Sequence, residues 1–217
     1  MKDIWNRVRE KAPLIHAITN YVTINDCANI ILASGASPIM AEAPEEVAEI
    51  CSHSHGLLLN LGMLRSDKLE AMILAGQAAN KRGIPVVFDP VGVGASAFRM
   101  NSARQLLHKV SCSVIRGNAS EILSLCQAGS SQGVDAAKAD ALTQNTLVQN
   151  ASFARALARR TCSIVAMTGK IDLVTDALPS DRQRMHALRS CDSHGGRESR
   201  GSSPGDPDRC YGNRTLW

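Results

Sequence analysis

Aromatic residues and long apolar runs are both scarce in this sequence. Phe, Trp and Tyr make up 3% of the 217 residues, whereas hydrophobic residues as a whole make up 44%. A chain of this size can form one domain with a sizeable core, which must then be mainly aliphatic. No run approaches the roughly 18 apolar residues of a membrane-spanning helix, and the N-terminal MKDIWNRVREKAP lacks the apolar stretch of a secretory signal. We therefore expect a cytoplasmic protein with no membrane partner.

Paired cysteines and blocks of basic residues are also missing. The seven cysteines form no C-x-x-C pair, and their spacing does not match a zinc site. An odd, scattered number of cysteines is typical of a reducing compartment. The formal net charge is only +4, with no cluster of Lys and Arg before residue 182. This distribution does not favour a nucleic-acid partner.

Short apolar runs alternate with helical patterns between residues 14 and 176, and glycines close several of them. We expect strands at 14–18, 37–41, 57–62, 84–90, 113–117, 162–169 and 171–176, and helices at 25–34, from Pro44, and at 66–82, 101–110, 118–126 and 151–160. Nearly continuous apolar strands separated by helices predict an α/β fold, with a mostly parallel sheet covered by helices on both faces. Thr23 or Asn25 is expected to cap the helix at 25–34.

The composition changes abruptly after residue 176. Residues 177–217 contain no Ile, Val, Phe or Lys, and instead contain seven Arg and six Ser without any hydrophobic period. Such a segment cannot bury enough apolar surface to order itself. We predict an incomplete domain over 1–176, followed by an aberrant, disordered tail over 177–217. The seven Arg of the tail face five acidic residues, and its aromatics come only at Tyr211 and Trp217, so RNA binding is not favoured.

Polar and glycine residues follow the expected strands. In an open parallel sheet, ligands bind beyond the carboxyl ends of the strands. The residues found there are Thr19, Asn20, Met40, Asn60, Gly62, Asp89, Gly92, Gly94, Arg116, Asn118, Glu121, Thr168 and Gly169. Their recurrence at one edge predicts a binding site for an anion and a metal.

Each candidate also has a plainer interpretation. Asp89 is suited to hold a metal or accept a proton, but acids also occur in ordinary turns. Glu121 is suited to hold Mg²⁺ through water, although the helix dipole alone favours an acid there. Arg116 is suited to a phosphate or to a surface ion pair. Gly92 and Gly94, like Thr168, can either approach a phosphate or serve a turn. Met40 and His16 are also typical core residues.

Several motifs, taken together, resemble one known family. The stretches "PLIHAITNYVTINDCANIILASGASPIMAEAPEEV" (13–47), "LLLNLGML" (57–64), "GIPVVFDPVGVGASAFR" (83–99), "VIRGNASEI" (114–122), "GVDA" (133–136) and "IVAMTGKIDLVTD" (164–176) are similar, in this order, to hydroxyethylthiazole kinases of thiamine biosynthesis, in the ribokinase-like superfamily. The resemblance covers about 176 residues.

The resemblance implies ATP-dependent, Mg²⁺-dependent phosphorylation of the hydroxyl of 4-methyl-5-(2-hydroxyethyl)thiazole. By position, Met40 would contact the thiazole, while Arg116 and Thr168 would bind ATP. Asn20, Asp89, Gly92, Gly94 and Glu121 would lie near the phosphates, with Asp89 and Glu121 as the metal residues. The family is typically a homotrimer with the thiazole site between subunits.

The sequence departs from this family after Asp176. The family continues through a pair of strands to a "TGTGC" motif, which binds the transferring phosphoryl group and ends in the presumed base. The motif is absent here, and Cys191 and Cys210 lie in no such context, so no catalytic base is assigned. We interpret the tail as the result of a truncation or a change of reading frame. Two functions follow: a thiazole kinase of severely impaired activity, or a non-catalytic protein that binds thiazole or nucleotide.

Overall fold

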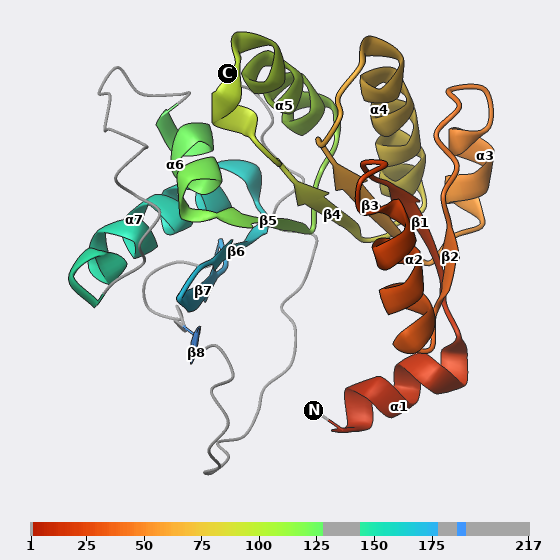
Figure 1. Ribbon diagram of the computed structural model, residues 1–217, viewed down its shortest axis with the longest axis horizontal. Coiled ribbons are helices and arrows are strands. Elements are labelled where there is room, and N and C mark those ends of the chain that lie inside the picture. The colour runs from red at the N-terminus through yellow and green to blue at the C-terminus, as the bar shows by residue number, and fades with distance from the viewer. Residues whose placement is uncertain (1, 128–143, 178–185, 190–217) are drawn as a thin grey trace.

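The computed structural model describes residues 2–127, 144–177 and 186–189 (Figure 1). The elements are α1 (Lys2–Lys11), β1 (Leu14–Ile18), α2 (Ile24–Ala33), β2 (Ser37–Ile39), α3 (Val47–Ser52), β3 (Gly56–Asn60), α4 (Ser66–Lys81), β4 (Val86–Asp89), the 3₁₀-helix η1 (Val93–Ala95), α5 (Ala97–Lys109), β5 (Val114–Asn118), α6 (Ala119–Gln127), α7 (Gln144–Thr161), β6 (Ile164–Thr168), β7 (Ile171–Thr175) and β8 (His186–Arg189). The predicted α/β class is confirmed.

The strands form one mostly parallel sheet. Their order in the described part of the chain is β2-β1-β3-β4-β5-β6-β7-β8. The pairs from β2 to β6 are parallel, whereas β6, β7 and β8 are joined by antiparallel pairing. In Figure 1, α3, α4, α5 and α6 follow one another in an arc along the sheet, and α1 and α2 lie at the opposite end from α7.

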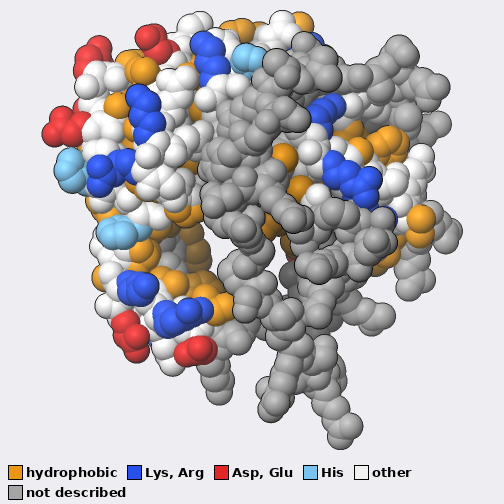
Figure 2. Space-filling model, turned by 180° about the vertical axis from the view of Figure 1, so that it is seen from behind, with side chains coloured by type: hydrophobic (Ala, Val, Ile, Leu, Met, Phe, Trp, Pro, Cys, Tyr) orange, Lys and Arg blue, Asp and Glu red, His pale blue; other side chains and the backbone are white. Residues whose placement is uncertain are grey.

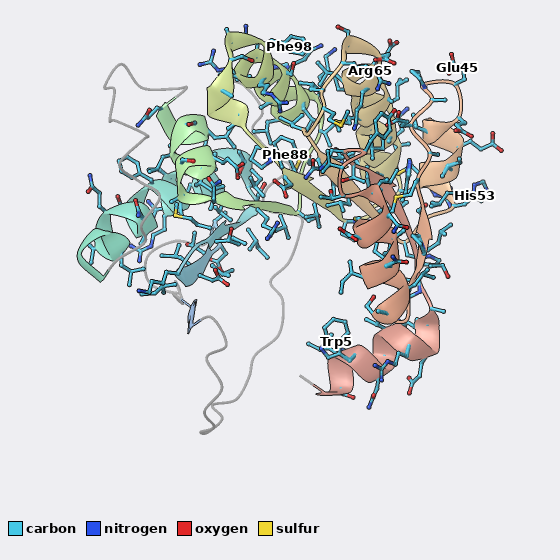
Figure 3. All side chains as sticks on the ribbon, viewed as in Figure 1. Trp5, Glu45, His53, Arg65, Phe88 and Phe98 are labelled. Atoms are coloured by element: carbon cyan, nitrogen blue, oxygen red, sulfur yellow. The ribbon has the colours of Figure 1, made fainter. Side chains whose placement is uncertain are left out.

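The two faces of the sheet are not equally covered. Alternate strand residues such as Leu59, Phe88 and Ile115 are fully buried in one continuous core with residues of α4 to α7, and Figure 3 shows Phe88 between the sheet and the helices. On the other face, Ala17 and Asn60 are buried, but Leu58, Val87 and Ala166 are only partly covered and Ile164 is 43% exposed. The aliphatic core predicted from composition therefore lies mainly on the face that α4 to α7 cover.

Several predicted boundaries were wrong. The helix expected from Pro44 begins at Val47, the one expected at 101–110 begins at Ala97, and the one expected at 151–160 begins at Gln144. The helix α1 was not predicted because its charged sequence has little apolar content to bury. Neither Thr23 nor Asn25 caps α2 with its side chain; Thr23 instead donates its N–H and hydroxyl to the Asn20 side-chain oxygen.

The predicted tail over 177–217 falls mostly outside the described residues. Within it, β8 pairs with β7, for example Ala187 with Leu173. The predicted domain boundary at residue 176 stays a prediction. The motif "GVDA" at 133–136 also lies outside the described residues.

Candidate active site at the carboxyl ends of the strands

An ion pair joins the ends of two neighbouring strands. Asp89 is the last residue of β4, and Arg116 lies within β5. The Nη1 atom of Arg116 lies 3.3 Å from Oδ2 of Asp89. The Asp89 side chain is largely buried whereas the Arg116 side chain is 56% exposed. The arginine therefore presents most of its guanidinium to solvent, where an anion can reach it.

Two asparagines extend this arrangement across the sheet. The Nδ2 group of Asn20, after β1, donates to Oδ1 of Asn60, at the end of β3, over 3.2 Å. Asn60 Oδ1 also accepts the Gly62 N–H over 2.9 Å, and the Asn60 side chain hydrogen-bonds Asp89. A continuous polar chain thus runs over β1, β3, β4 and β5. The sequence analysis places Asn60 among the strand-end residues of the predicted binding site, although the family resemblance assigns it no specific role.

Glu121 occupies the first turn of α6, where both of its carboxylate oxygens accept backbone N–H groups. Oε1 accepts from Gly92 over 3.0 Å, and Oε2 accepts from Asn118 over 2.8 Å. Asn118 Oδ1 in turn accepts the Glu121 N–H over 2.8 Å. This reciprocal pair is a helix capping box. Glu121 therefore fixes the Gly-rich loop to α6, and its remaining lone pairs can reach a cation through water.

The environment of Asp89 makes it an unusual acid. Burial raises the pKa of Asp89 to about 6, and the nearby Glu121 carboxylate adds to that rise. Arg116 and the Asn60 hydrogen bond lower the pKa and offset only part of the effect. A carboxylate with too little positive charge nearby is suited to a cation or to proton transfer near neutral pH.

The two glycines of the loop have different structural roles. Gly92 adopts a φ of +63°, in the left-handed region that favours glycine. A Cβ on Gly94 would lie 2.7 Å from Oγ of Ser124 in α6, so close packing of η1 against α6 already requires glycine there. Thr168 ends β6 and donates its hydroxyl to the Gly117 carbonyl over 3.3 Å. In register it faces Asn118, which places it beside the Arg116 strand.

The structure does not bring every predicted residue together. Met40 follows β2 at the sheet edge, with β1 and β3 between it and the strand of Asp89. His16 is fully buried in β1, and its Nε2 lies 2.8 Å from the Ala41 carbonyl oxygen. Burial lowers the pKa of His16. His16 is thus a core histidine, as its position within a strand indicated.

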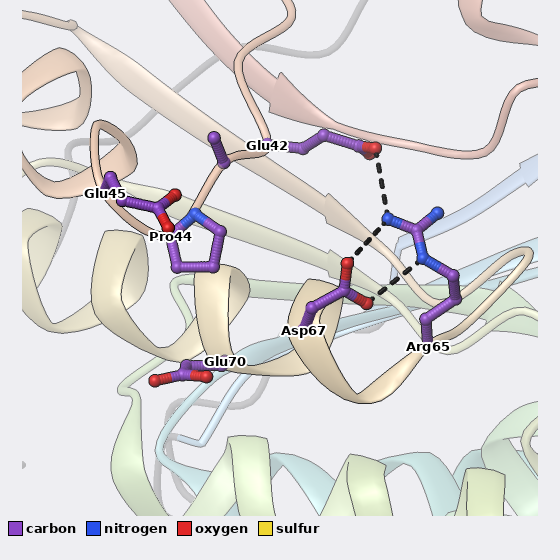
Figure 4. A pocket seen from close by; sticks show the side chains of 7 residues that line it. Glu42, Pro44, Glu45, Arg65, Asp67 and Glu70 are labelled. Atoms are coloured by element: carbon purple, nitrogen blue, oxygen red, sulfur yellow. Dashed lines mark hydrogen bonds and ion pairs between the residues drawn. The ribbon is translucent and has the colours of Figure 1, made fainter.

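A second polar cluster lies beside Met40, at the ends of β1, β2 and β3. Arg65 pairs with Asp67 over 2.9 Å and with Glu42 over 3.5 Å (Figure 4). Tyr21 donates its hydroxyl to Glu42. The open cavity at this cluster has a volume of about 610 Å³ and is lined by Glu42, Ala43, Pro44, Glu45, Arg65, Asp67 and Glu70. Sequence reasoning did not select this cluster because its polar groups come from separate segments: Tyr21 after β1, Glu42 after β2, and Arg65 and Asp67 at the start of α4.

The fit of a divalent cation can be judged from the donors. Mg²⁺ prefers hard oxygen ligands and retains several waters. Asp89 supplies such an oxygen, and its proximity to Glu121 leaves local negative charge that a cation would neutralise. No group of three His, Cys, Asp or Glu side chains gathers at one point in residues 2–127, 144–177 and 186–189. The residues therefore fit a cation held by one or two carboxylates together with water and substrate oxygens.

Comparison with protein families gives a match over most of the chain. The model of the hydroxyethylthiazole kinase family matches residues 5–186. Among curated relatives, hydroxyethylthiazole kinase of Clostridium beijerinckii is 50% identical over 174 residues, which cover 80% of this chain and 62% of the relative. That of Ruminiclostridium cellulolyticum is 48% identical over 172 residues, with 79% and 62% covered.

Solved structures agree with this match. Hydroxyethylthiazole kinase from Pyrococcus horikoshii OT3 superposes with a TM-score of 0.70 at 36% identity, and the match covers 82% of this chain and 65% of that one. Adenosine kinase from Anopheles gambiae superposes with a TM-score of 0.55 at 11% identity, over 88% and 67%; this likeness concerns the fold alone.

The chain spans about 62% of the length of these two curated relatives. The described part contains no helix long and apolar enough to cross a membrane. The matched segment includes every strand-end residue of the site from Asn20 to Thr168. The family match over residues 5–186, together with the curated relatives at 48–50% identity and the structure at 36% identity, leads to one conclusion: the chain belongs to the hydroxyethylthiazole kinase family.

Proposed function

We propose that this chain carries the ligand-binding part of a hydroxyethylthiazole kinase, which transfers the γ-phosphoryl group of ATP to the hydroxyl of 4-methyl-5-(2-hydroxyethyl)thiazole. The observation that carries the proposal is the polar chain Asn20–Asn60–Asp89–Arg116, which spans four strand ends. Phosphoryl transfer depends mainly on positioning and on charge neutralisation. The exposed Arg116 can position a phosphate and neutralise part of its charge, and the neighbouring carboxylates of Asp89 and Glu121 can bind a cation that neutralises more.

Each residue has a specific part in this proposal. Arg116 and Thr168 bind the nucleotide phosphates, Arg116 through its exposed guanidinium. Asp89 and Glu121 would hold Mg²⁺, Glu121 through water, and the metal would neutralise phosphate charge. Asn20, Gly92 and Gly94 line the phosphate side of the site, while Met40 contacts the thiazole.

A homotrimer fits the surface at one end of the sheet. Helix α2 has no buried side chain, and its apolar residues Ile30 and Leu32 are more than half exposed. Trp5 of the neighbouring helix α1 is 52% exposed (Figure 3). Exposed apolar side chains gathered on neighbouring elements are typical of protein interfaces. In Figure 2, acidic and basic side chains lie together on the left part of the view, while basic side chains alone are visible on the right part. The small formal net charge of +4 does not favour a nucleic-acid partner.

Turnover by residues 1–217 alone is expected to be severely reduced. The sequence lacks the "TGTGC" motif that family resemblance assigns to the transferring phosphoryl group and the base. Loss of even one preorganised donor to a transition state costs roughly 10²–10³ in rate. A non-catalytic protein that binds thiazole or nucleotide is therefore the second candidate.

The test compares binding with turnover. Titration calorimetry with Mg·ATP and with the thiazole alcohol measures binding, and detection of the phosphorylated thiazole measures turnover. Arg116→Met should weaken Mg·ATP binding, whereas the matched substitution Arg82→Met, at the exposed end of α4, should not. If the wild-type protein binds neither Mg·ATP nor the thiazole alcohol, the proposed function is overturned. If it phosphorylates the thiazole at the rate of a full-length relative, the expected impairment is overturned.

We also propose that the unusual composition after residue 176 records a change of reading frame. The family match continues to residue 186, so resequencing should cover codons 170–217 and the DNA beyond them. Recovery of the "TGTGC" motif by one inserted or deleted base would support this origin. If resequencing confirms the present reading frame through codon 217, the proposed frame change is contradicted.

A further inference from the structure

Lys68 is the only lysine among the largest fully buried side chains of the described residues. Its side chain has no exposed surface, although it lies in the first turn of α4. A cation at this end of a helix is disfavoured by the helix dipole, and burial of an ammonium group is itself costly. Specific contacts must therefore offset both penalties.

Those contacts come from three neighbouring strand ends. The Nζ atom of Lys68 donates to the Thr19 carbonyl after β1, and to the Gly62 carbonyl after β3 over 3.3 Å. It also lies 3.8 Å from Oε2 of Glu42, after β2, and 5.5 Å from the centroid of the Tyr21 ring. One ammonium group thus joins the loops of β1, β2 and β3.

The two carbonyls lie next to the asparagines of the site. Thr19 immediately precedes Asn20, and the Gly62 N–H donates to Asn60 Oδ1 over 2.9 Å. The Asn20–Asn60 hydrogen bond therefore connects the same two loops that Lys68 joins. The space between these loops is small, because a Cβ on Gly62 would lie 2.6 Å from Cβ of Asn20.

We propose that Lys68 is a positioning residue, whose buried ammonium group sets the spacing of the loops after β1 and β3 and so holds the Asn20–Asn60 pair in place for ligand binding. What the pair binds rests on the proposed function. The spacing itself does not, and it can be measured without a ligand.

The first measurement is amide hydrogen exchange by NMR. Lys68→Met removes the ammonium group and retains an unbranched side chain. Lys81→Met, in the last turn of the same helix and exposed, is the matched control. We expect Lys68→Met to accelerate exchange of the Gly62 amide by at least about tenfold. A tenfold change corresponds to the free energy lost with one charge-assisted hydrogen bond. The amides of β5 and β6 should keep their wild-type rates.

The second measurement is restoration by a small cation. Lys68→Ala leaves a space into which ethylammonium can bring an ammonium group, and tetramethylammonium at equal ionic strength has no N–H to donate. Ethylammonium should restore slow Gly62 exchange and Mg·ATP affinity together. Lys68→Arg, which retains a buried donor cation, should fall between Lys68→Met and the wild type. These two variants also provide the test if Lys68→Met does not fold.

Two results would overturn the proposal: unchanged Gly62 exchange in every Lys68 variant, or acceleration that is uniform over the whole sheet. Uniform acceleration would assign to Lys68 a role in general stability. If the wild-type protein binds no Mg·ATP, the proposed function fails, while Gly62 exchange still decides the positioning role.

Discussion

Asp89 and Arg116 form an asymmetric pair: the carboxylate is 14% exposed and the guanidinium 56% exposed, with 3.3 Å between their nearest atoms. The buried partner is therefore the one whose charge is unfavourable. Arg116 and Asn60 lower the pKa of Asp89, but burial and Glu121 outweigh them and raise it to about 6. This imbalance leads to the first prediction.

Asp89→Asn should stabilise the fold at pH 8 by about 1–3 kcal/mol. Because the folded-state pKa of Asp89 is raised above 3.8, its contribution to stability is present below about pH 3.8. That contribution is lost as the pH rises through about 6. The gain from Asp89→Asn should therefore vanish towards pH 4 in urea unfolding series. The same variant should bind Mg·ATP more weakly.

Asp67→Asn is the control, because the pKa of Asp67 is shifted in the opposite direction to that of Asp89. The hydrogen bond from Arg65 lowers the pKa of Asp67, so the native carboxylate stabilises the fold at pH 7 and that stabilisation is lost in acid. Asp67→Asn should give no increase in stability at pH 8. An increase in both variants would attribute the Asp89 effect to net charge.

Gly62→Ala should disrupt the polar chain by steric contact. The added Cβ would lie 2.6 Å from Cβ of Asn20 and 2.8 Å from Oδ1 of Asn60. We expect a loss of about 1–3 kcal/mol of unfolding free energy, together with weaker ligand binding in calorimetry. Gly56→Ala is the control, since its Cβ would meet only the Cδ1 atom of Ile15 at 3.2 Å. Equal effects of the two variants would contradict the prediction.

Acid should weaken the fold through His16. Burial lowers the pKa of His16, and its Nδ1 atom has no hydrogen-bond partner among the residues that the structure describes. The neutral ring therefore supplies stability that is present above about pH 6.5 and lost as the pH falls through the lowered folded-state pKa. His16→Gln should flatten the decline of unfolding free energy between pH 7 and pH 5. The exposed His53→Gln variant should retain the wild-type decline.

Ile30→Glu should reduce the size of the assembly in solution. Ile30 lies on α2 and is 67% exposed, where a charge would be desolvated in a subunit interface. Sedimentation velocity should show a shift from trimer to monomer. Val148 lies in α7 and is 80% exposed. The control variant Val148→Glu should leave the sedimentation coefficient unchanged. A wild-type monomer would rule out the proposed trimer.

The strand-end site was largely predictable because parallel strands end at one edge of the sheet. The apolar runs at 57–62 and 84–90 placed Asn60 and Asp89 at neighbouring strand ends, although the strands end at Asn60 and Asp89 rather than after them. Arg116 and Glu121 followed from the next strand and helix. The sequence left two roles open for Arg116, phosphate binding and a surface ion pair. The contact with Asp89 is an ion pair, and the exposed part of the guanidinium leaves phosphate binding possible.

The contacts made by the buried Lys68 and the partly buried Arg99 could not be predicted. Lys68 occurs in the sequence "SDKLE", which is typical of an exposed first turn. Its burial depends on the loops of β1 and β2, which are far from it in the chain. Likewise, Arg99 donates through Nη1 to the Leu61 and Val91 carbonyls, at 2.9 Å each, a role that only the tertiary arrangement defines.

Lys68 and Arg99 share one property: both donate hydrogen bonds to main-chain carbonyl groups of the loops. A carbonyl oxygen is present whichever residue occupies the position. Away from the close contact at Gly62, the loops can therefore accept many side-chain substitutions without a change in their separation. Variation in ligand preference among relatives could then accumulate in these loops, while the two cations continue to define the distances between them.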